Sequence, residues 1–138
     1  MDLNRLTEKS QEALQVAQGK AAEYGHQETD GEHLLLALLE QEGGLFPRLL
    51  ARLEVEPDAL RDEVERELAR RPRVSGPGAE SGKVYVTQRL QKILARAEDE
   101  AKRLNDEYIS VEHLVLALLA EGKGTPAGSI LEIGRAHV

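Results

Sequence analysis

The chain has 138 residues, of which 41% are hydrophobic and 3% aromatic, and it contains no cysteine. Its length suits one globular domain with a real core, and without cysteine a disulfide framework is excluded. The net charge of −7 argues against a nucleic-acid surface, which needs clustered Lys and Arg. No apolar run reaches the roughly 18 residues of a membrane span and the N-terminus is polar, so we predict a cytoplasmic protein without a membrane partner.

The first predicted helix covers residues 7–24. Its small and apolar residues recur at three- and four-residue steps, and Thr7 can cap its first turn. Gly25 follows, as a glycine commonly does just after a helix. These signals predict an amphipathic helix.

The second predicted helix follows Asp30 and covers about residues 31–42. Its block from Glu32 to Leu39 is apolar nearly all round, which is typical of a helix at the centre of a domain. Glu32 lies in the first turn, where the helix dipole favours a carboxylate. Its role is left open between stabilising the helix start and gripping a ligand. We interpret His33 as a packing and hydrogen-bonding group.

Two shorter helices complete this half of the chain. The Gly43-Gly44 pair breaks the chain before a helix over residues 45–53, in which Pro47 is tolerable only in the first turn. Pro57 is well placed to open a fourth helix, whose mixed charges indicate a solvated outer face. Its apolar residues are spaced by four and comprise Leu60, Val64 and Leu68.

The next stretch, residues 72–86, is predicted to be a linker. It is rich in Pro, Gly and Ser, which cannot sustain a helix. The run from Val84 to Val86 could be extended, but three residues are too few to predict a sheet.

The remaining chain repeats the first half at a spacing of 80 residues. Glu112 to Leu119 repeats Glu32 to Leu39, and Thr87 repeats Thr7. The repeat predicts helices over residues 87–104 and 110–121, with Ser110 as N-cap, and a third helix that begins at 127–131. The chain is therefore a duplication, and internal repeats determine the architecture.

The last seven residues, 132–138, neither continue the helical pattern nor match the first half. One codon choice for them contains a widely used sequencing-adapter sequence. We therefore expect a non-native tail and a second repeat that is cut short. A verified genomic sequence that encodes the same residues 132–138 would contradict this hypothesis.

The sequence carries no catalytic or metal-binding pattern. Gly122-Lys123-Gly124-Thr125 lacks the leading glycine and the strand of a phosphate-binding loop. The four histidines form no ligand pair, and there is no cysteine or serine nucleophile motif. We expect no catalysis and no metal. Two classes remain: a binding module for polypeptide segments, or a purely structural or oligomerisation domain. An exposed apolar groove would favour the first.

Three segments carry a resemblance to a known family. They are Met1 to Thr7, Glu32 to Leu39, and Asn105 to Leu114, which together resemble the Clp N-terminal repeat domain. The resemblance implies an all-α fold of two pseudo-repeats of a four-helix unit, here residues 1–71 and 87–131, with the second incomplete. It also implies attachment to the AAA+ modules of a parent hexamer, which would use ATP and Mg. Those modules are absent here, so the chain itself is expected to be no enzyme and to hold no cofactor.

The opening and the Arg70 to Gly76 junction look most like the bacterial disaggregase branch of the family. By that resemblance the domain would recruit unfolded or aggregated proteins as a monomer, with a co-chaperone or adaptor as a further partner. The residues that match positions implicated in substrate handling are Thr7, Asp106 and Glu112. The alternative is the protease-associated branch, whose phosphoarginine site matches Thr7, Glu32, Thr87 and Glu112.

Overall fold

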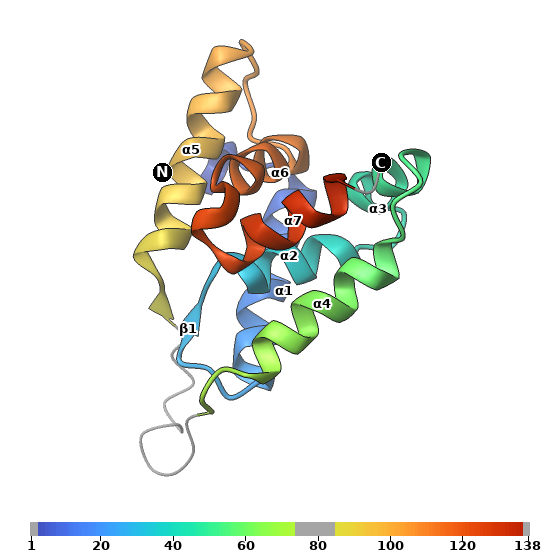
Figure 1. Cartoon of the computed structure of the whole chain (residues 1–138). Helices are drawn as coiled ribbons and strands as arrows, with labels where there is room; N and C mark the ends of the chain where they lie inside the picture. The colour runs from blue at the N-terminus through green and yellow to red at the C-terminus, as the bar shows by residue number, and fades with distance from the viewer. Residues whose placement is uncertain (1–2, 74–84, 137–138) are drawn as a thin grey trace.

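The computed structural model describes residues 3–73 and 85–136, and the prediction of an all-α fold is confirmed (Figure 1). Its helices are α1 (Glu8–Glu23), α2 (Gly31–Glu40), α3 (Leu45–Arg52), α4 (Pro57–Ala69), α5 (Gln88–Arg103), α6 (Val111–Ala120) and α7 (Pro126–Ala136). Two short 3-10 helices, Leu3–Arg5 and Gly122–Gly124, precede α1 and α7.

The predicted capping residues begin the first helix of each repeat. Thr7 Oγ1 accepts from the Ser10 backbone N–H at 3.2 Å, and Thr87 Oγ1 accepts from that of Leu90 at 3.0 Å. Each hydroxyl thereby satisfies an amide that has no partner inside its helix. Gly25 adopts a φ of 74° just after α1, a conformation that glycine reaches without steric cost.

The core is built around α2 and α6. Every residue from Leu34 to Leu39 is at most 6% exposed, as the apolar block predicts. α1 packs against α2, and α5 packs against α6, so the repeated sequence forms the same helix pair twice. In the first repeat α4 also lies along α2, and α7 lies between α4 and α6 (Figure 1). The apolar stripe of α4, Leu60, Val64 and Leu68, is buried.

One expectation about the linker is wrong, because the residues before Thr87 do form a sheet. β2 (Tyr85–Val86) pairs in parallel with β1 (Glu28–Thr29). Such short strands are stable here because the partner strand comes from the other repeat and both lead into capped helices. The equivalent bridge, with the roles of the two repeats exchanged, joins Leu6 to Ile109. Each repeat thus pairs the start of its first helix with the segment before the core helix of the other.

The helical pattern was also expected to stop at Leu131, and here the structure differs. α7 continues to Ala136. Residues 132–136 contain no proline, so a helix that has begun at Pro126 can propagate through them by its own backbone hydrogen bonds. That the tail is non-native stays a prediction. Positions 137–138, and the linker over 74–84, lie outside the described residues.

Candidate functional site

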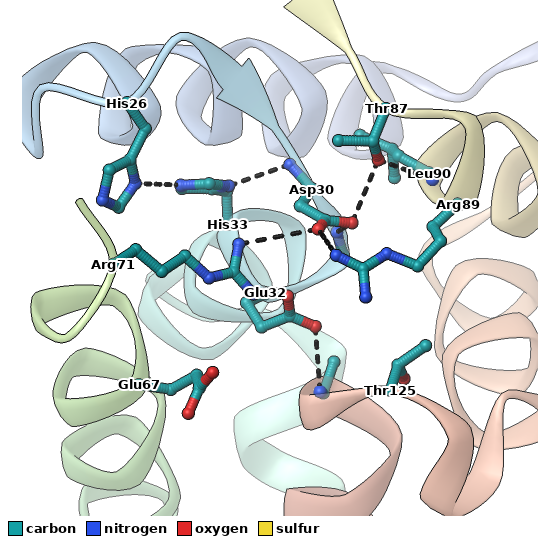
Figure 2. Close-up of polar contacts among 12 residues, drawn as sticks. His26, Asp30, Glu32, His33, Glu67, Arg71, Thr87, Arg89, Leu90 and Thr125 are labelled. Atoms are coloured by element: carbon teal, nitrogen blue, oxygen red, sulfur yellow. Dashed lines mark hydrogen bonds and ion pairs between the residues drawn. The ribbon is translucent and has the colours of Figure 1, made fainter. Parts of the chain in front are cut away.

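The five predicted site residues fall into two places, one at the start of each core helix. Glu32 and Thr87 lie with Asp30, Arg71 and Arg89, a group that we call the closed junction (Figure 2). Thr7, Asp106 and Glu112 belong to the other helix start, which we call the open junction. The names reflect how fully the polar groups are paired.

Asp30 is the centre of the closed junction. It is 3% exposed, and its Oδ1 accepts from the Gly31 N–H at 2.8 Å and from the Thr87 hydroxyl at 3.0 Å. Its Oδ2 accepts from the Arg89 guanidinium. Asp30, the N-cap of α2, therefore also ties the first repeat to the start of α5 in the second. A buried carboxylate is tolerable when it is paired and hydrogen-bonded in this way.

Glu32 makes the second tie of the closed junction. Its Oε1 accepts from the guanidinium of Arg71, which also lies 3.5 Å from Asp30 Oδ2. Its Oε2 accepts from the backbone N–H of Ala127 at 2.9 Å, in the first turn of α7 (Figure 2). Glu32 is 1% exposed. Both of its oxygens are occupied by groups of the same chain.

The two core-helix histidines close the first turn of their helices, as predicted for hydrogen-bonding groups. His33 Nδ1 accepts from the Asp30 N–H at 2.9 Å, and His113 Nδ1 accepts from the Ser110 N–H at the same distance. Each imidazole thus reaches back to the N-cap, a role that Glu or Gln takes in the usual capping box. Because Nδ1 is an acceptor, the hydrogen-bond network assigns the proton of the neutral ring to Nε2.

The second partner of each imidazole differs between the repeats. His33 Nε2 lies 2.9 Å from His26 Nδ1, whereas His113 Nε2 lies 2.8 Å from Asp106 Oδ2. His26 and Asp106 occupy equivalent positions of the repeat. The pKa of His33 is lowered from 6.5 to about 4, mainly by burial and to a smaller extent by the neighbouring His26 and Arg71. Burial also lowers the pKa of His26.

The open junction has fewer internal partners. The Thr7 N–H donates to the Ile109 carbonyl at 3.0 Å, which brings Thr7 beside the segment that leads into α6. The Asp106 side chain is 50% exposed beyond its contact with His113. Glu112 is exposed, and within residues 3–73 and 85–136 no hydrogen bond or ion pair holds its carboxylate. In this part of the chain its carboxylate is unpaired, in contrast to that of Glu32.

An apolar groove of about 890 Å³ opens next to Glu112. α3 and α6 form its walls, and Glu112 is its charged residue. Three of its leucines are large apolar groups exposed to solvent: Leu49 at 42%, Leu53 at 52% and Leu116 at 40%. The lining residues are Leu45, Phe46, Leu49, Leu50, Leu53, Val55, Leu60, Val111, Glu112, Val115, Leu116, Leu119 and Leu131.

Sequence reasoning missed the members of the closed junction that lie outside the repeat motif. Arg71 belongs to the mixed-charge end of the fourth predicted helix, which by its pattern is a solvated face, and Arg89 carries no sequence signal. The groove has a sequence signal in α6, which is apolar nearly all round, so that α5 alone cannot cover its apolar surface. Among the described residues no cluster of three or more acidic, His or Cys side chains could hold a metal ion. No helix of that same part of the chain has the length and apolarity needed to cross a bilayer.

Comparison with known proteins gives a match over residues 5–132 to the family described as the Clp repeat (R) N-terminal domain. The chaperone protein ClpB of Nitratidesulfovibrio vulgaris (strain Hildenborough) is 52% identical over 130 residues, which are 94% of this chain and 15% of that protein. ClpB of Bacillus cereus is 50% identical over 124 residues, which are 90% of this chain and 14% of that protein. The chain thus spans about one seventh of these relatives.

Solved structures agree on the fold. The N-terminal domain of the ClpV1 ATPase from the Escherichia coli EAEC Sci1 type VI secretion system has a TM-score of 0.75 at 30% identity. That match covers 86% of this chain and 69% of the other. The Hsp104 N-terminal domain from Candida albicans has a TM-score of 0.77 at 18% identity, with 94% and 81% covered. At that identity the second likeness concerns the fold alone.

Proposed function

This chain belongs to the Clp repeat N-terminal domain family, and from that premise we propose that it is the substrate-recruiting N-terminal domain of a ClpB-type protein disaggregase. In this role it binds unfolded or aggregated polypeptide segments in the cytoplasm and passes them to the AAA+ modules of the parent hexamer. The chain itself would carry no ATPase chemistry.

The observation that carries the proposal is the apolar groove beside the open junction. Unfolded segments differ from folded proteins in exposing apolar side chains, and a groove with exposed Leu49, Leu53 and Leu116 can bury such side chains. Burial stabilises by about 25 cal/mol per Å² of apolar area. Glu112 at the groove and Asp106 and Thr7 at the open junction add acceptors for a basic or polar group of the segment.

The phosphoarginine alternative receives less support from the same geometry. It relies on Glu32 and Thr87 together with Glu112 and Thr7. In the closed junction Glu32 already accepts from Arg71 and Ala127, and Thr87 already donates to Asp30. A phosphoarginine ligand would have to displace an internal arginine to reach Glu32. We therefore propose general recruitment of apolar segments through Glu112, Thr7 and Asp106.

The test is binding of a fluorescently labelled, permanently unfolded casein-like chain, followed by fluorescence anisotropy. Leu49→Gln with Leu116→Gln removes apolar surface from the groove while keeping good helix formers. We expect the double variant to bind at least about tenfold more weakly, which corresponds to roughly 1.4 kcal/mol. The matched control is Leu104→Gln, since Leu104 is 48% exposed but lies outside the groove lining.

The control should bind within about twofold of the wild type, because it removes exposed apolar surface elsewhere. Equal losses in the groove variant and the control would contradict the proposal. Binding of free phosphoarginine in preference to the unfolded chain, with sensitivity to Glu32→Gln, would favour the alternative instead.

A further inference from the structure

Two histidines of the first repeat form a hydrogen-bonded chain beside the closed junction (Figure 2). The Asp30 N–H donates to His33 Nδ1 at 2.9 Å, and His33 Nε2 lies 2.9 Å from His26 Nδ1. Because His33 Nδ1 is an acceptor, the proton of that neutral ring is on Nε2, and this N–H donates to His26 Nδ1. Every nitrogen from the Asp30 amide to His26 Nδ1 therefore has a fixed role.

An added proton breaks this chain wherever it binds. A proton on His33 Nδ1 would face the Asp30 N–H, and a proton on His26 Nδ1 would face the N–H of His33. In either case two donors oppose each other and a partly buried donor loses its acceptor, which is costly. The remaining nitrogen, His26 Nε2, already carries the proton of its own neutral ring. The chain is thus complete only when both rings are neutral.

The surroundings also disfavour a positive charge on the pair. His33 is fully buried, and burial is the main reason that its pKa is lowered to about 4. The carboxylates around the pair are already matched by guanidinium groups, so a further proton leaves an unbalanced charge. The titratable and charged groups around the two rings, from the end of α1, the start of α2, the end of α4 and the start of α5, are Tyr24, Asp30, Glu32, Arg71, Arg73 and Arg89.

The equivalent place in the second repeat can accommodate a proton. His113 Nε2 lies 2.8 Å from Asp106 Oδ2, a carboxylate that can pair with a protonated imidazole. Ser110 Oγ lies 3.1 Å from His113 Nδ1 and can accept from a proton there. In the first repeat the N-cap is Asp30, whose Oδ1 already accepts from the Gly31 N–H and the Thr87 hydroxyl. The two repeats therefore differ in whether their core-helix histidine tolerates a charge.

From this geometry we propose that the His26–His33 pair is an acid-sensitive switch of the closed junction. A proton taken up from solvent by the pair breaks the closure of the first turn of α2. Asp30 then loses its fixed position as N-cap, and with it the contacts to Thr87 and Arg89 that join the first repeat to the second. The inference goes beyond the proposed function and does not rest on it, because it concerns only contacts within the chain.

Hydrogen exchange of two amides reports this opening directly. The Asp30 N–H donates to His33, and the Ala127 N–H donates to Glu32 Oε2 at 2.9 Å, so both are protected while the closed junction is intact. Acid favours the open form below the ordinary histidine pKa of 6.5, because the pKa of His33 in the closed form is only about 4. Between pH 7 and pH 5 the protection factors of both amides, corrected for the intrinsic effect of pH, should fall about twentyfold.

A switch of this kind opens the junction without unfolding the protein. Low concentrations of urea separate the two events, because only an opening that exposes much surface depends steeply on urea. At pH 5 we expect exchange of the Asp30 and Ala127 amides to be nearly independent of urea, whereas the amide of the buried Leu36 follows global unfolding. The same steep dependence for all three amides would mean that acid unfolds the whole domain, which would overturn the proposal.

A glutamine at position 33 removes the titration and keeps the closure. In His33→Gln the side-chain carbonyl can still accept from the Asp30 N–H, as in the usual capping box. The pH effect on the two amides should shrink from about twentyfold to at most about threefold. The matched control is His113→Gln, which changes the equivalent histidine and should leave the wild-type pH effect unchanged. Equal effects of the two variants, or no effect of His33→Gln, would overturn the proposal.

A measurement on the wild-type protein keeps the proposal testable if His33→Gln does not fold. Nitrogen-15 NMR of the histidine rings at pH 7 should show His26 and His33 neutral, each with its proton on Nε2. Between pH 7 and pH 5 the loss of this state should accompany the loss of protection at Asp30 and Ala127. A proton on His33 Nδ1 at pH 7, or opening without any change at either ring, would overturn the switch.

Discussion

The core helices share the block from Glu32 to Leu39 with a single change, yet the glutamate that opens the block has very different surroundings in the two repeats. Glu32 is buried between Arg71 and Ala127, whereas its repeat partner Glu112 faces solvent beside the groove. The residues that make the difference lie outside the repeated block, at the end of α4 and the start of α7. A duplicated motif therefore fixes its own helix and cap, while its availability to a partner is decided by what packs against it.

The largest expected difference between the junctions is in stability. Glu32→Ala removes the acceptor of a buried ion pair and of the Ala127 N–H, so it should lower the free energy of unfolding by about 3–5 kcal/mol. Glu112→Ala should change it by at most about 0.5 kcal/mol, as expected of an exposed side chain without an internal partner. Urea denaturation of the two variants measures both values. Similar costs would mean that the two junctions are equivalent in solution.

The buried pair of His33 and His26 in the first repeat predicts that the protein is sensitive to acid. The pKa of His33 is lowered from 6.5 to about 4 by burial, so between these pH values the unfolded chain binds more protons than the folded chain. Stability should therefore fall as the pH drops below 6.5, by about 2 kcal/mol at pH 5 from this residue alone. Urea midpoints at pH 7, 6 and 5 measure the loss.

A swap variant sharpens this comparison. His26→Asp gives His33 the carboxylate that His113 has in Asp106, and a nearby negative charge favours the protonated imidazole. The variant should lose less stability than the wild type between pH 7 and 5. Carboxylates stay mostly ionised in this range, so they contribute little to the comparison. If the variant and the wild type lost the same stability between pH 7 and 5, protonation of His33 would not be the cause of the loss.

The first helical residue is the next point of comparison, since Gly31 in α2 corresponds to Val111 in α6. A Cβ at position 31 would lie 3.0 Å from Ile93 Cδ1, so Gly31→Val should destabilise by about 1–2 kcal/mol through overpacking. Val111→Ile adds a carbon beside the open groove and should cost less than about 0.5 kcal/mol. Thermal unfolding of both variants tests the difference. If Gly31→Val left the unfolding temperature unchanged, Gly31 and Ile93 would not be in the close contact described.

The sequence contained most of the fold and only part of the site. The repeat, the caps at Thr7 and Thr87 and the stripe of α4 could be predicted because they depend on neighbours three or four residues away. The parallel pairing of β1 with β2 could not, because it joins segments that only the packing of the repeats brings together. The same holds for Arg71 and Glu32, which are 39 residues apart. Local signals identify candidate carboxylates, but their burial is a tertiary property.

The smallest expected difference concerns the two capping threonines. Thr7→Ala and Thr87→Ala each remove a helix cap, at a cost of about 1 kcal/mol. The Thr87 hydroxyl also donates to Asp30 at 3.0 Å, whereas that of Thr7 donates to the nearby Ser10. Thr87→Ala leaves the buried Asp30 with one donor fewer, so it should cost about 0.5–1 kcal/mol more than Thr7→Ala in urea unfolding.

Thr87→Ala is expected to be the less stable of the two variants, whereas Thr7→Ala is expected to be the weaker binder. Thr7 belongs to the open junction, whose Glu112 lines the groove in which a recruited segment is proposed to bind, and the Thr87 hydroxyl is occupied inside the closed junction. Thr7→Ala should therefore weaken binding of the unfolded casein-like chain, while Thr87→Ala should leave it within about twofold once both proteins are held well below their unfolding midpoints. If Thr87→Ala were instead the weaker binder, binding would simply follow stability. The closed junction would then not differ from the open junction in its role toward a partner.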